Sequence, residues 1–236
     1  MNPLIIAIIF MVLGAIALTF FLIEKIKSYS VKATIIKSIT SLFFIALAAY
    51  SCYIRGLHIL GLFVVLGLVF GLLGDIWLDF KYVFKEQDKP FTYAGFAVFG
   101  IGHILYITGM ALEFLGNESI LYIIFPVAIG VLVGLGNGML GEPMKLNYGK
   151  MKWIVCVYGG LLFSMMFVAI SMCILHKFND VTPIMIAAGG ALFAISDLIL
   201  SGTYFGVNRE RPVDIITNAI SYYMAQYVIA FSLFFL

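Results

Sequence analysis

Charged residues are scarce in this chain. Only 11% of its 236 residues are Asp, Glu, Lys or Arg, whereas 63% are hydrophobic, and the mean hydropathy is +1.11. So small a polar fraction does not suffice to cover the surface of a water-soluble globule. The net charge of +2 is also too small for a nucleic-acid-binding surface. The sequence therefore predicts an integral membrane protein that binds no nucleic acid.

Cysteine and histidine are equally scarce, with three of each. The cysteines all lie within apolar runs, at Cys52, Cys156 and Cys173. Thiols in such runs usually pack as small apolar groups rather than form disulfides. His58 and His176 are expected at one membrane surface, which leaves His103 as the one histidine deep in the bilayer. This ligand set is too small for a zinc site, so we expect no metal and no cofactor.

Long apolar runs fill most of the chain. A transmembrane helix needs ~20 such residues, and lipid offers no partner to backbone polar groups outside a helix or a closed barrel. Eight runs meet this length, at roughly 3–23, 34–54, 57–80, 91–112, 119–140, 152–175, 181–203 and 213–236. They leave little sequence for anything else. We therefore predict a single all-α membrane domain over residues 1–236, a bundle of eight transmembrane helices.

The basic residues predict the orientation of these spans. They gather in the loops after spans one, three, five and seven, at Lys25, Lys27, Lys32, Lys81, Lys85, Lys89, Lys145, Lys150, Lys152, Arg209 and Arg211. The alternate loops contain only Arg55 and Lys177. The positive-inside rule places the basic loops in the cytoplasm and both termini outside. A bacterial-type plasma membrane is the expected location.

An acidic stripe runs along the third span. Gly67, Gly71, Asp75 and Asp79 follow one another at steps of four, so they share one face of a helix. Small residues on such a face allow close helix packing. Asp79 lies one turn nearer the cytoplasm and beside Lys81. The sequence leaves open whether Asp79 is a second functional carboxylate or a solvated helix end.

The seventh span repeats this theme. Gly190, Ala194, Asp197 and Ser201 again lie on one face near the end of an apolar run. An ionisable residue in hydrocarbon costs ~2.5–3.5 kcal/mol on insertion scales, so such residues usually face the bundle interior. The alternative is that each acid reaches headgroup water. We expect the fold to bring Asp75 and Asp197 together in the cytoplasmic half of the bilayer.

Further polar residues fall at a similar depth. The eighth span has five hydrogen-bonding residues, Asn218, Ser221, Tyr222, Tyr223 and Gln226. Contacts between helices explain one or two of them, but not readily five. His103 and Tyr106 lie in the fourth span, and this histidine is either catalytic or a simple interhelical hydrogen-bonding group. Lys37 lies in the second span, and three roles are open for it. Its side chain extends to the membrane surface, or binds a phosphate, or changes the proton affinity of a carboxylate. We predict a cavity open to the cytoplasmic leaflet.

The spacing of these residues suggests an internal duplication. Asp75 precedes His103 by 28 residues, and Asp197 precedes Gln226 by 29. If spans one to four and five to eight are parallel repeats, the two acids face each other across a pseudo-two-fold axis along the membrane normal.

These motifs resemble those of the YhhN family, the lysoplasmalogenases. The shared features, in chain order, are Lys37, Gly74-Asp75, Phe99-x-x-x-His103-x-x-Tyr106, Ser196-Asp197 and Tyr222-x-x-x-Gln226. They extend over nearly the whole chain. Trp77 and Asp79 are not part of the family pattern. The resemblance implies hydrolysis of the vinyl ether bond of a lysoplasmalogen, which gives a fatty aldehyde and glycerophosphoethanolamine or glycerophosphocholine.

The resemblance also implies roles for individual residues. Asp75 and Asp197 are the expected acid and base, in an order that the sequence does not assign. His103, Tyr223 and Gln226 are expected to orient water or the leaving oxygen. The expected substrate-binding residues are Lys37, Tyr106, Ser196, Asn218 and Tyr222. The partners are then a lysophospholipid and the bilayer, and the sequence does not indicate an oligomeric state.

Two other classes of function remain open from the sequence. A proton-coupled membrane transporter would use the same intramembrane acids as a relay. A lipid-binding or regulatory membrane protein is the third alternative, and it would release no aldehyde from any lysolipid.

Overall fold

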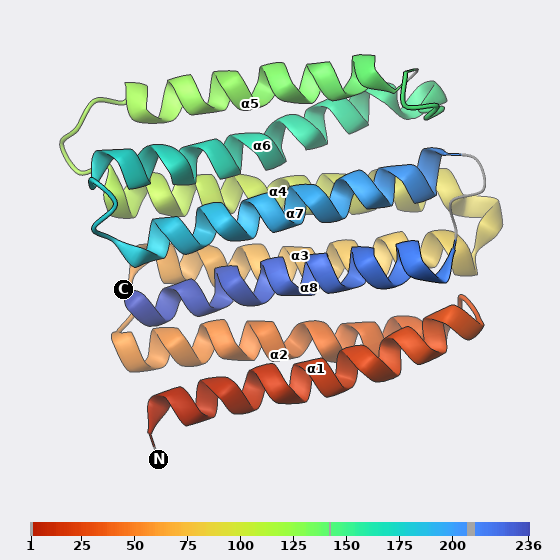
Figure 1. Ribbon diagram of the computed structural model, residues 1–236, viewed down its shortest axis with the longest axis horizontal. Coiled ribbons are helices and arrows are strands. Elements are labelled where there is room, and N and C mark those ends of the chain that lie inside the picture. The colour runs from red at the N-terminus through yellow and green to blue at the C-terminus, as the bar shows by residue number, and fades with distance from the viewer. Residues whose placement is uncertain (1, 142, 207–210) are drawn as a thin grey trace.

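A computed structural model describes residues 2–141, 143–206 and 211–236, and over these residues the chain is helical (Figure 1). The α-helices are α1 (Pro3–Lys27), α2 (Val31–Arg55), α3 (Ile59–Val83), α4 (Asp88–Phe114), α5 (Leu121–Leu140), α6 (Lys152–Leu175), α7 (Val181–Phe205) and α8 (Pro212–Ser232). Three short 3-10 helices accompany them, η1 (Lys85–Gln87), η2 (Gly149–Met151) and η3 (Leu233–Phe235). The predicted all-α class is confirmed.

Seven of the eight helices in the described residues, α1 to α7, are long and apolar enough to cross a membrane. The predicted bundle of eight helices is confirmed, and α8 differs from the other seven in hydropathy. Helix α8 has 21 residues, which is long enough, but its polar residues make it less apolar than the others. It lies alongside the other helices (Figure 1). Its residues Tyr222, Tyr223 and Gln226 are buried. These polar groups face protein rather than lipid.

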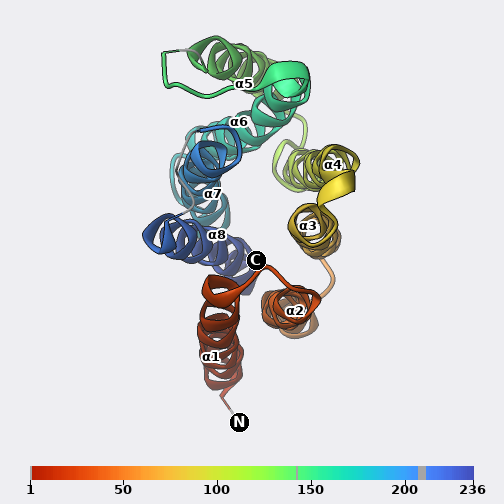
Figure 2. The same cartoon turned by 90° about the vertical axis from the view of Figure 1, so that its right-hand side faces the viewer.

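The helices form two columns, seen end-on in Figure 2. One column contains α2, α3 and α4, and the other contains α5, α6, α7, α8 and α1. The main contacts between the two halves of the chain are those of α2 with α8 and of α4 with α6, and α8 also contacts α1 and α3. If helices one to four correspond to helices five to eight, α2 corresponds to α6 and α8 to α4, so the two main contacts are equivalent. The main contacts are therefore compatible with the suggested parallel four-helix repeats.

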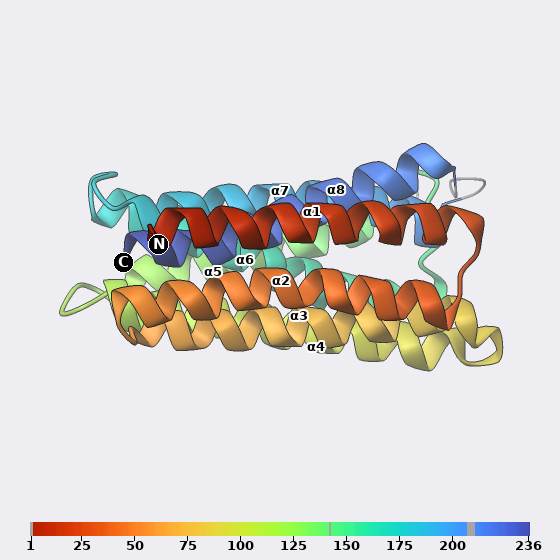
Figure 3. The ribbon, with the colours of Figure 1, turned by 90° about the horizontal axis from the view of Figure 1, so that it is seen from below.

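The two ends of the bundle differ in charge. Both termini lie at one end, and the connections α1–α2, α3–α4, α5–α6 and α7–α8 lie at the other (Figures 1 and 3). We call the latter the lysine-rich end, because it contains the basic loops except Arg209, which lies outside the described residues. His58 and His176 lie in the connections at the opposite end, where they pair with Glu113 and Asp180. The segregation of charge predicted from the sequence is thus present in the fold.

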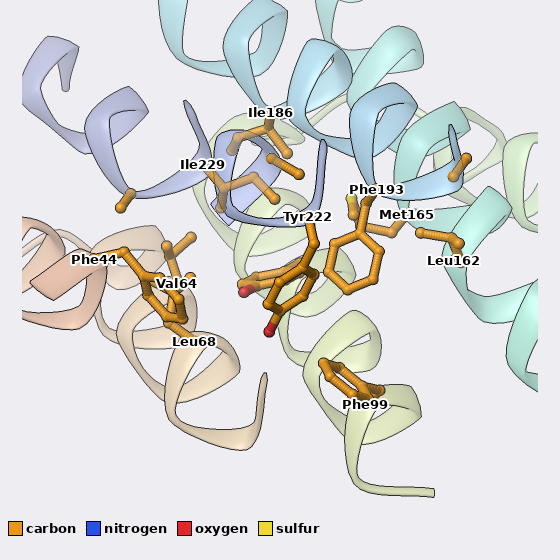
Figure 4. Packing of buried hydrophobic residues seen from close by; sticks show 14 of the residues in the cluster. Phe44, Val64, Leu68, Phe99, Leu162, Met165, Ile186, Phe193, Tyr222 and Ile229 are labelled. Carbon is orange, nitrogen blue, oxygen red and sulfur yellow. The ribbon is translucent and has the colours of Figure 1, made fainter. Parts of the chain in front are cut away.

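A packed apolar core fills the bundle away from the lysine-rich end. Phe44, Val64, Leu68, Ile186 and Ile229 have no exposed surface, and they interlock between the two columns (Figure 4). Toward the lysine-rich end this core gives way to the rings of Phe99, Phe193 and Tyr222.

Glycines set the separation of α5 and α6. A Cβ atom at Gly134 would lie 2.3 Å from the backbone nitrogen of Gly160 and 2.6 Å from the carbonyl oxygen of Cys156. Both neighbours are backbone atoms, which do not move without shifting the helix. A Cβ atom at Gly136, two residues further on, would meet nothing within 4 Å.

This difference gives a matched test of packing. At both positions alanine stabilises the helix by ~1 kcal/mol relative to glycine. At Gly134 the added methyl group also overpacks the contact with α6, which costs ~1–3 kcal/mol of folding free energy. Gly134→Ala is therefore expected to lower the melting temperature in detergent, and Gly136→Ala to leave it unchanged or raise it. Thiol labelling of the buried Cys156 and Cys173 during heating measures the transition. Equal melting temperatures for the two variants would contradict this view of the α5–α6 contact.

Candidate functional site

A cavity near the lysine-rich end contains both acids of the predicted pair. The cavity lies between residues of α1, α2, α3, α4, α6, α7 and α8, and its volume is about 80 Å³, or about 780 Å³ when the adjoining space open to solvent is included. Asp75 from α3 and Asp197 from α7 both line it. Two residues 122 positions apart in the sequence thus line one cavity. This juxtaposition is the one on which the proposed chemistry depends.

Asp75 is held by three donors. The Lys37 Nζ lies 3.0 Å from Asp75 Oδ1, while Asp75 Oδ2 accepts hydrogen bonds from Ser41 Oγ at 3.0 Å and from Tyr222 OH at 2.9 Å. Gln226 Nε2 in turn donates to the Tyr222 hydroxyl at 3.0 Å. Only 3% of Asp75 is exposed. A carboxylate that accepts an ammonium and two hydroxyl hydrogen bonds is fixed in position and stabilised as the anion.

The glycines on α3 make room for these partners. A Cβ atom at Gly71 would lie 3.0 Å from Gln226 Nε2, and one at Gly74 would lie 2.5 Å from the Phe99 ring. Both glycines are on the stripe or beside it, one turn or less before Asp75. The small residues that the sequence placed with the acids therefore let α4 and α8 approach the acid face closely.

Asp79 is the second carboxylate of this network. Its Oδ1 lies 2.6 Å from Lys25 Nζ and 3.6 Å from Lys37 Nζ, and only 4% of the residue is exposed. The interpretation of Asp79 as a solvated helix end is therefore wrong. Of the three interpretations of Lys37, its contacts favour modulation of carboxylates. The sequence predicts Lys25 only as part of a basic loop. In the structure Lys25 lies in the last turn of α1, and only 8% of it is exposed.

Asp197 has a different partner. The hydroxyl of Tyr158, on α6, donates a hydrogen bond to Asp197 Oδ2. Sequence reasoning missed Tyr158, because a tyrosine in an apolar run is unremarkable. A signal lies in the spacing, since Lys37 precedes Asp75 by 38 residues and Tyr158 precedes Asp197 by 39. Helix α2 thus supplies a cation to one acid, and α6 supplies a neutral phenol to the other.

His103 and Tyr106 lie behind the wall of the cavity. The His103 ring is 5.0 Å from the Phe193 ring and 5.6 Å from the Tyr158 ring, and both of those residues line the cavity. His103 itself does not line it. Within the described residues, neither ring nitrogen of His103 nor the hydroxyl of Tyr106 has a hydrogen-bond partner. The roles predicted for these two residues stay predictions.

The polar residues of α8 divide into two groups. Tyr223 lines the cavity and donates to the Lys37 carbonyl at 3.1 Å, and Tyr222 donates to Asp75 as described. Asn218 instead donates to the backbone oxygen and to Oγ of Ser196, at 2.8 and 2.9 Å. Ser221 bonds within its own helix, to the Thr217 carbonyl at 2.8 Å. Asn218 and Ser196 therefore join α8 to α7, although both also line the cavity.

No group of three or more His, Cys, Asp or Glu residues in the described ranges is arranged to hold a metal ion. The three cysteines are free thiols. The titratable groups that line the cavity are carboxyls, ammonium groups and phenols.

Comparison with known proteins gives a family but no close relative. No curated protein and no solved structure matches the chain. The model of the YhhN family matches residues 32–233, which is most of the chain. The matched range includes Lys37, Asp75, Tyr158, Asp197 and Gln226, whereas Lys25 lies before it. This chain, with its two acids in a single cavity, belongs to the YhhN family.

Proposed function

We propose that this protein is a lysoplasmalogenase, an ether hydrolase that cleaves the vinyl ether bond of lysoplasmalogens. The family to which the chain belongs includes lysoplasmalogenases. The observation that carries the proposal is that Asp75 and Asp197 line one cavity but have partners of different charge. Asp75 is paired with the Lys37 ammonium, and Asp197 is bonded to the neutral Tyr158 hydroxyl. Acid-catalysed hydrolysis of a vinyl ether needs this combination of a proton donor and an anion.

The reaction proceeds in three steps. A carboxylic acid protonates the outer alkenyl carbon, so that positive charge develops on the ether-bearing carbon as an oxocarbenium ion. Water adds to that carbon and gives its proton to a carboxylate, which forms a hemiacetal. Collapse of the hemiacetal breaks the carbon–oxygen bond to glycerol, transfers the hydroxyl proton to the departing oxygen and releases the aldehyde. The sum is one vinyl ether and one water giving one aldehyde and one alcohol.

The contacts of the two acids support a division of labour between them. Asp75 faces the Lys37 ammonium and two hydroxyl donors, which suit a permanent carboxylate that stabilises the cation and accepts the proton of water. Asp197 accepts a hydrogen bond from the neutral hydroxyl of Tyr158, and a carboxyl with a neutral partner avoids placing a charge in the bundle interior by holding a proton. We therefore assign Asp197 as the proton donor and Asp75 as the base.

The neighbouring polar groups then act mainly by positioning. Tyr222 holds one oxygen of Asp75, and Gln226 holds the Tyr222 hydroxyl in turn. Tyr223 bonds the backbone of Lys37 and so fixes α8 against α2. Lys37 is committed to Asp75 and Asp79, which argues for a role in charge balance rather than as the main ligand of the lipid phosphate.

The position of the cavity fits a lipid substrate better than a transport path. We propose that the lysine-rich end faces the cytoplasm, because four basic loops meet there. The lining residues of the cavity lie toward this end, and fully buried apolar side chains such as Val64, Leu68 and Ile229 pack between the columns beyond it (Figure 4). A cavity that opens from one side suits a lysophospholipid that enters from its own leaflet.

Replacing either acid tests the proposal. Asp197→Asn removes the proton donor and is expected to lower the rate of aldehyde release by at least 10²-fold, since general acid catalysis contributes ~10²–10⁴-fold. Asp75→Asn is expected to have a similar effect. Asp75→Asn alone leaves two lysines, Lys25 and Lys37, facing the single charge of Asp79. The double variant Asp75→Asn with Lys37→Met restores charge balance and separates lost chemistry from lost folding.

The matched control is Glu118→Gln, an exposed acid in the α4–α5 connection at the far end of the bundle. Purified protein is given a lysoplasmalogen, and aldehyde is measured together with the melting temperature. Near-normal turnover by a folded Asp197→Asn protein would end the assignment. Absence of aldehyde with the unaltered protein, together with lipid- or proton-dependent flux in proteoliposomes, would favour the transporter.

A second prediction concerns Tyr158. Tyr158→Phe removes the hydroxyl that bonds Asp197 but keeps the ring, which stacks on Phe96 with centroids 5.1 Å apart. Loss of one hydrogen bond to the acid is expected to lower kcat about 10-fold, with little change in KM, because the bond fixes the carboxyl rather than the substrate. Tyr93→Phe, whose hydroxyl bonds the Lys150 carbonyl outside the cavity, is the control. An equal change in both variants would argue against a specific role for Tyr158.

A further inference from the structure

A second cavity lies against Asp197, between α5, α6, α7 and the α5–α6 connection. Its volume is about 50 Å³, or about 510 Å³ when the adjoining space open to solvent is included. Of the two acids, only Asp197 lines it. In Figure 2, α5 lies beyond α6 at one end of its column. We call this space the second cavity, and the one that contains Asp75 and Asp197 the main cavity.

The small and polar stripe of α7 faces the second cavity. Ala194, Asp197 and Ser201, which the sequence places on one face of that helix, all line it. Asp197 and Tyr158 also line the main cavity, and they are the two lining residues that both cavities share. Asp197 is partly exposed, whereas only 3% of Asp75 is. The hydrogen-bonded pair of Tyr158 and Asp197 therefore forms part of the wall between the two cavities.

The second cavity contains polar groups that lack protein partners. Asn137, from the apolar helix α5, and Ser201 both line it, and neither side chain forms a hydrogen bond with another described residue. Among the described residues, Asp197 Oδ1 also accepts no hydrogen bond, because Tyr158 donates to Oδ2. A bound water needs roughly 10–15 Å³ and a few polar partners, and the second cavity offers both. We therefore expect it to contain water.

The proposed reaction leaves the two acids with exchanged protonation states. Asp197 gives its proton to the alkenyl carbon, and Asp75 receives a proton from the attacking water. The collapse of the hemiacetal moves only the proton of its own hydroxyl, so it resets neither acid. Before the next turnover Asp197 must gain a proton and Asp75 must lose one. Transfer through the main cavity has to wait until the products leave it.

We propose that the second cavity is a water-filled proton inlet to Asp197, which stays open while a lipid occupies the main cavity. A proton passes from bulk water, through water bound at Asn137 and Ser201, to the Asp197 carboxylate. Asp75 returns its proton to bulk water through the main cavity, so one proton enters and one leaves in each turnover. The need for an inlet rests on the proposed function, but the inlet itself does not require hydrolysis.

Exchange of the Asp197 proton for deuterium tests the inlet without turnover. The carboxyl C=O stretch that is missing from the infrared spectrum of Asp197→Asn identifies this group, and its shift in heavy water reports exchange. A saturated 1-O-alkyl lysolipid, which has no vinyl ether to cleave, closes the main cavity of the purified full chain. The band of the unaltered protein is expected to shift equally fast with and without this lipid.

Two substitutions close the inlet in different ways. Ser201→Leu fills space, and it also narrows a smaller cavity of about 20 Å³ that Ser201 and Asp197 both line. Asn137→Leu keeps a side chain of similar size but removes the polar group. With lipid bound, each variant is expected to slow exchange about 10-fold, which corresponds to ~1.4 kcal/mol of barrier. Without lipid, exchange stays fast through the main cavity. The control is Thr217→Leu, at an exposed position of α8 where the hydroxyl bonds the Val213 carbonyl.

Three results would overturn the inlet. The first is slower exchange in the unaltered protein when the lipid alone is added. The second is exchange in the lipid-bound Ser201→Leu and Asn137→Leu proteins that is as fast as in Thr217→Leu. The third is the absence of an Asp197 carboxyl band at rest, because a donor that is refilled holds its proton before the substrate arrives.

The hydrolase is tested separately, by aldehyde release from a lysoplasmalogen. Exchange that the lipid does not slow in the unaltered protein but does slow in both leucine variants, without any aldehyde release, would support the inlet and overturn the hydrolase. Aldehyde release together with exchange that the lipid alone blocks would do the reverse.

Discussion

The burial of charge inside a membrane domain governs this structure. Lys25, Lys37, Asp75 and Asp79 neutralise one another within a helical bundle, and each comes from a different turn of α1, α2 or α3. Breaking such a network by removing one member leaves an uncompensated charge, which is costly where water is scarce. The three helices are therefore held in one register at the lysine-rich end. The ion pairs among these four residues therefore hold the wall of the cavity in place.

Close approach of the helices makes this network possible. Gly71 and Gly74 remove the side chains that would hold α4 and α8 away from the acid face of α3, so Gln226 and Phe99 come within contact distance of the α3 backbone. The hydroxyl of Tyr222 then reaches Asp75. Apolar packing deeper in the bundle completes the enclosure, with Phe44, Val64 and Ile229 fully buried. The distances between the polar groups at the site thus depend on small residues of α3 and on large residues of α4 and α8.

Much of this arrangement could be predicted from the sequence, because bilayer physics restricts the options. Hydropathy identified the helices, and the position of basic residues placed the loops at two ends. The membrane cost of ionisation singled out Asp75 and Asp197. The predicted eighth span is present as α8, and its polar residues face protein and not lipid. Sequence reasoning failed for Lys25, which looks like a loop residue although its ammonium contacts Asp79 in the fold. It also failed for Tyr158, whose position depends on a contact between α6 and α7 that no local pattern encodes.

The proposed reaction gives the two acids different tasks, and the two halves of the bundle offer a reason for the difference. If the halves are parallel repeats, Asp75 and Asp197 take equivalent positions on α3 and α7, and with identical neighbours they would have similar protonation behaviour. The helices that precede them break the equivalence, because α2 supplies the Lys37 ammonium and α6 supplies the Tyr158 hydroxyl. Pairs of titratable groups in contrasting environments are the usual basis of acid and base assignment. Under the proposed function, this one difference between the halves, an ammonium beside Asp75 and a phenol beside Asp197, makes Asp75 the proton acceptor and Asp197 the donor.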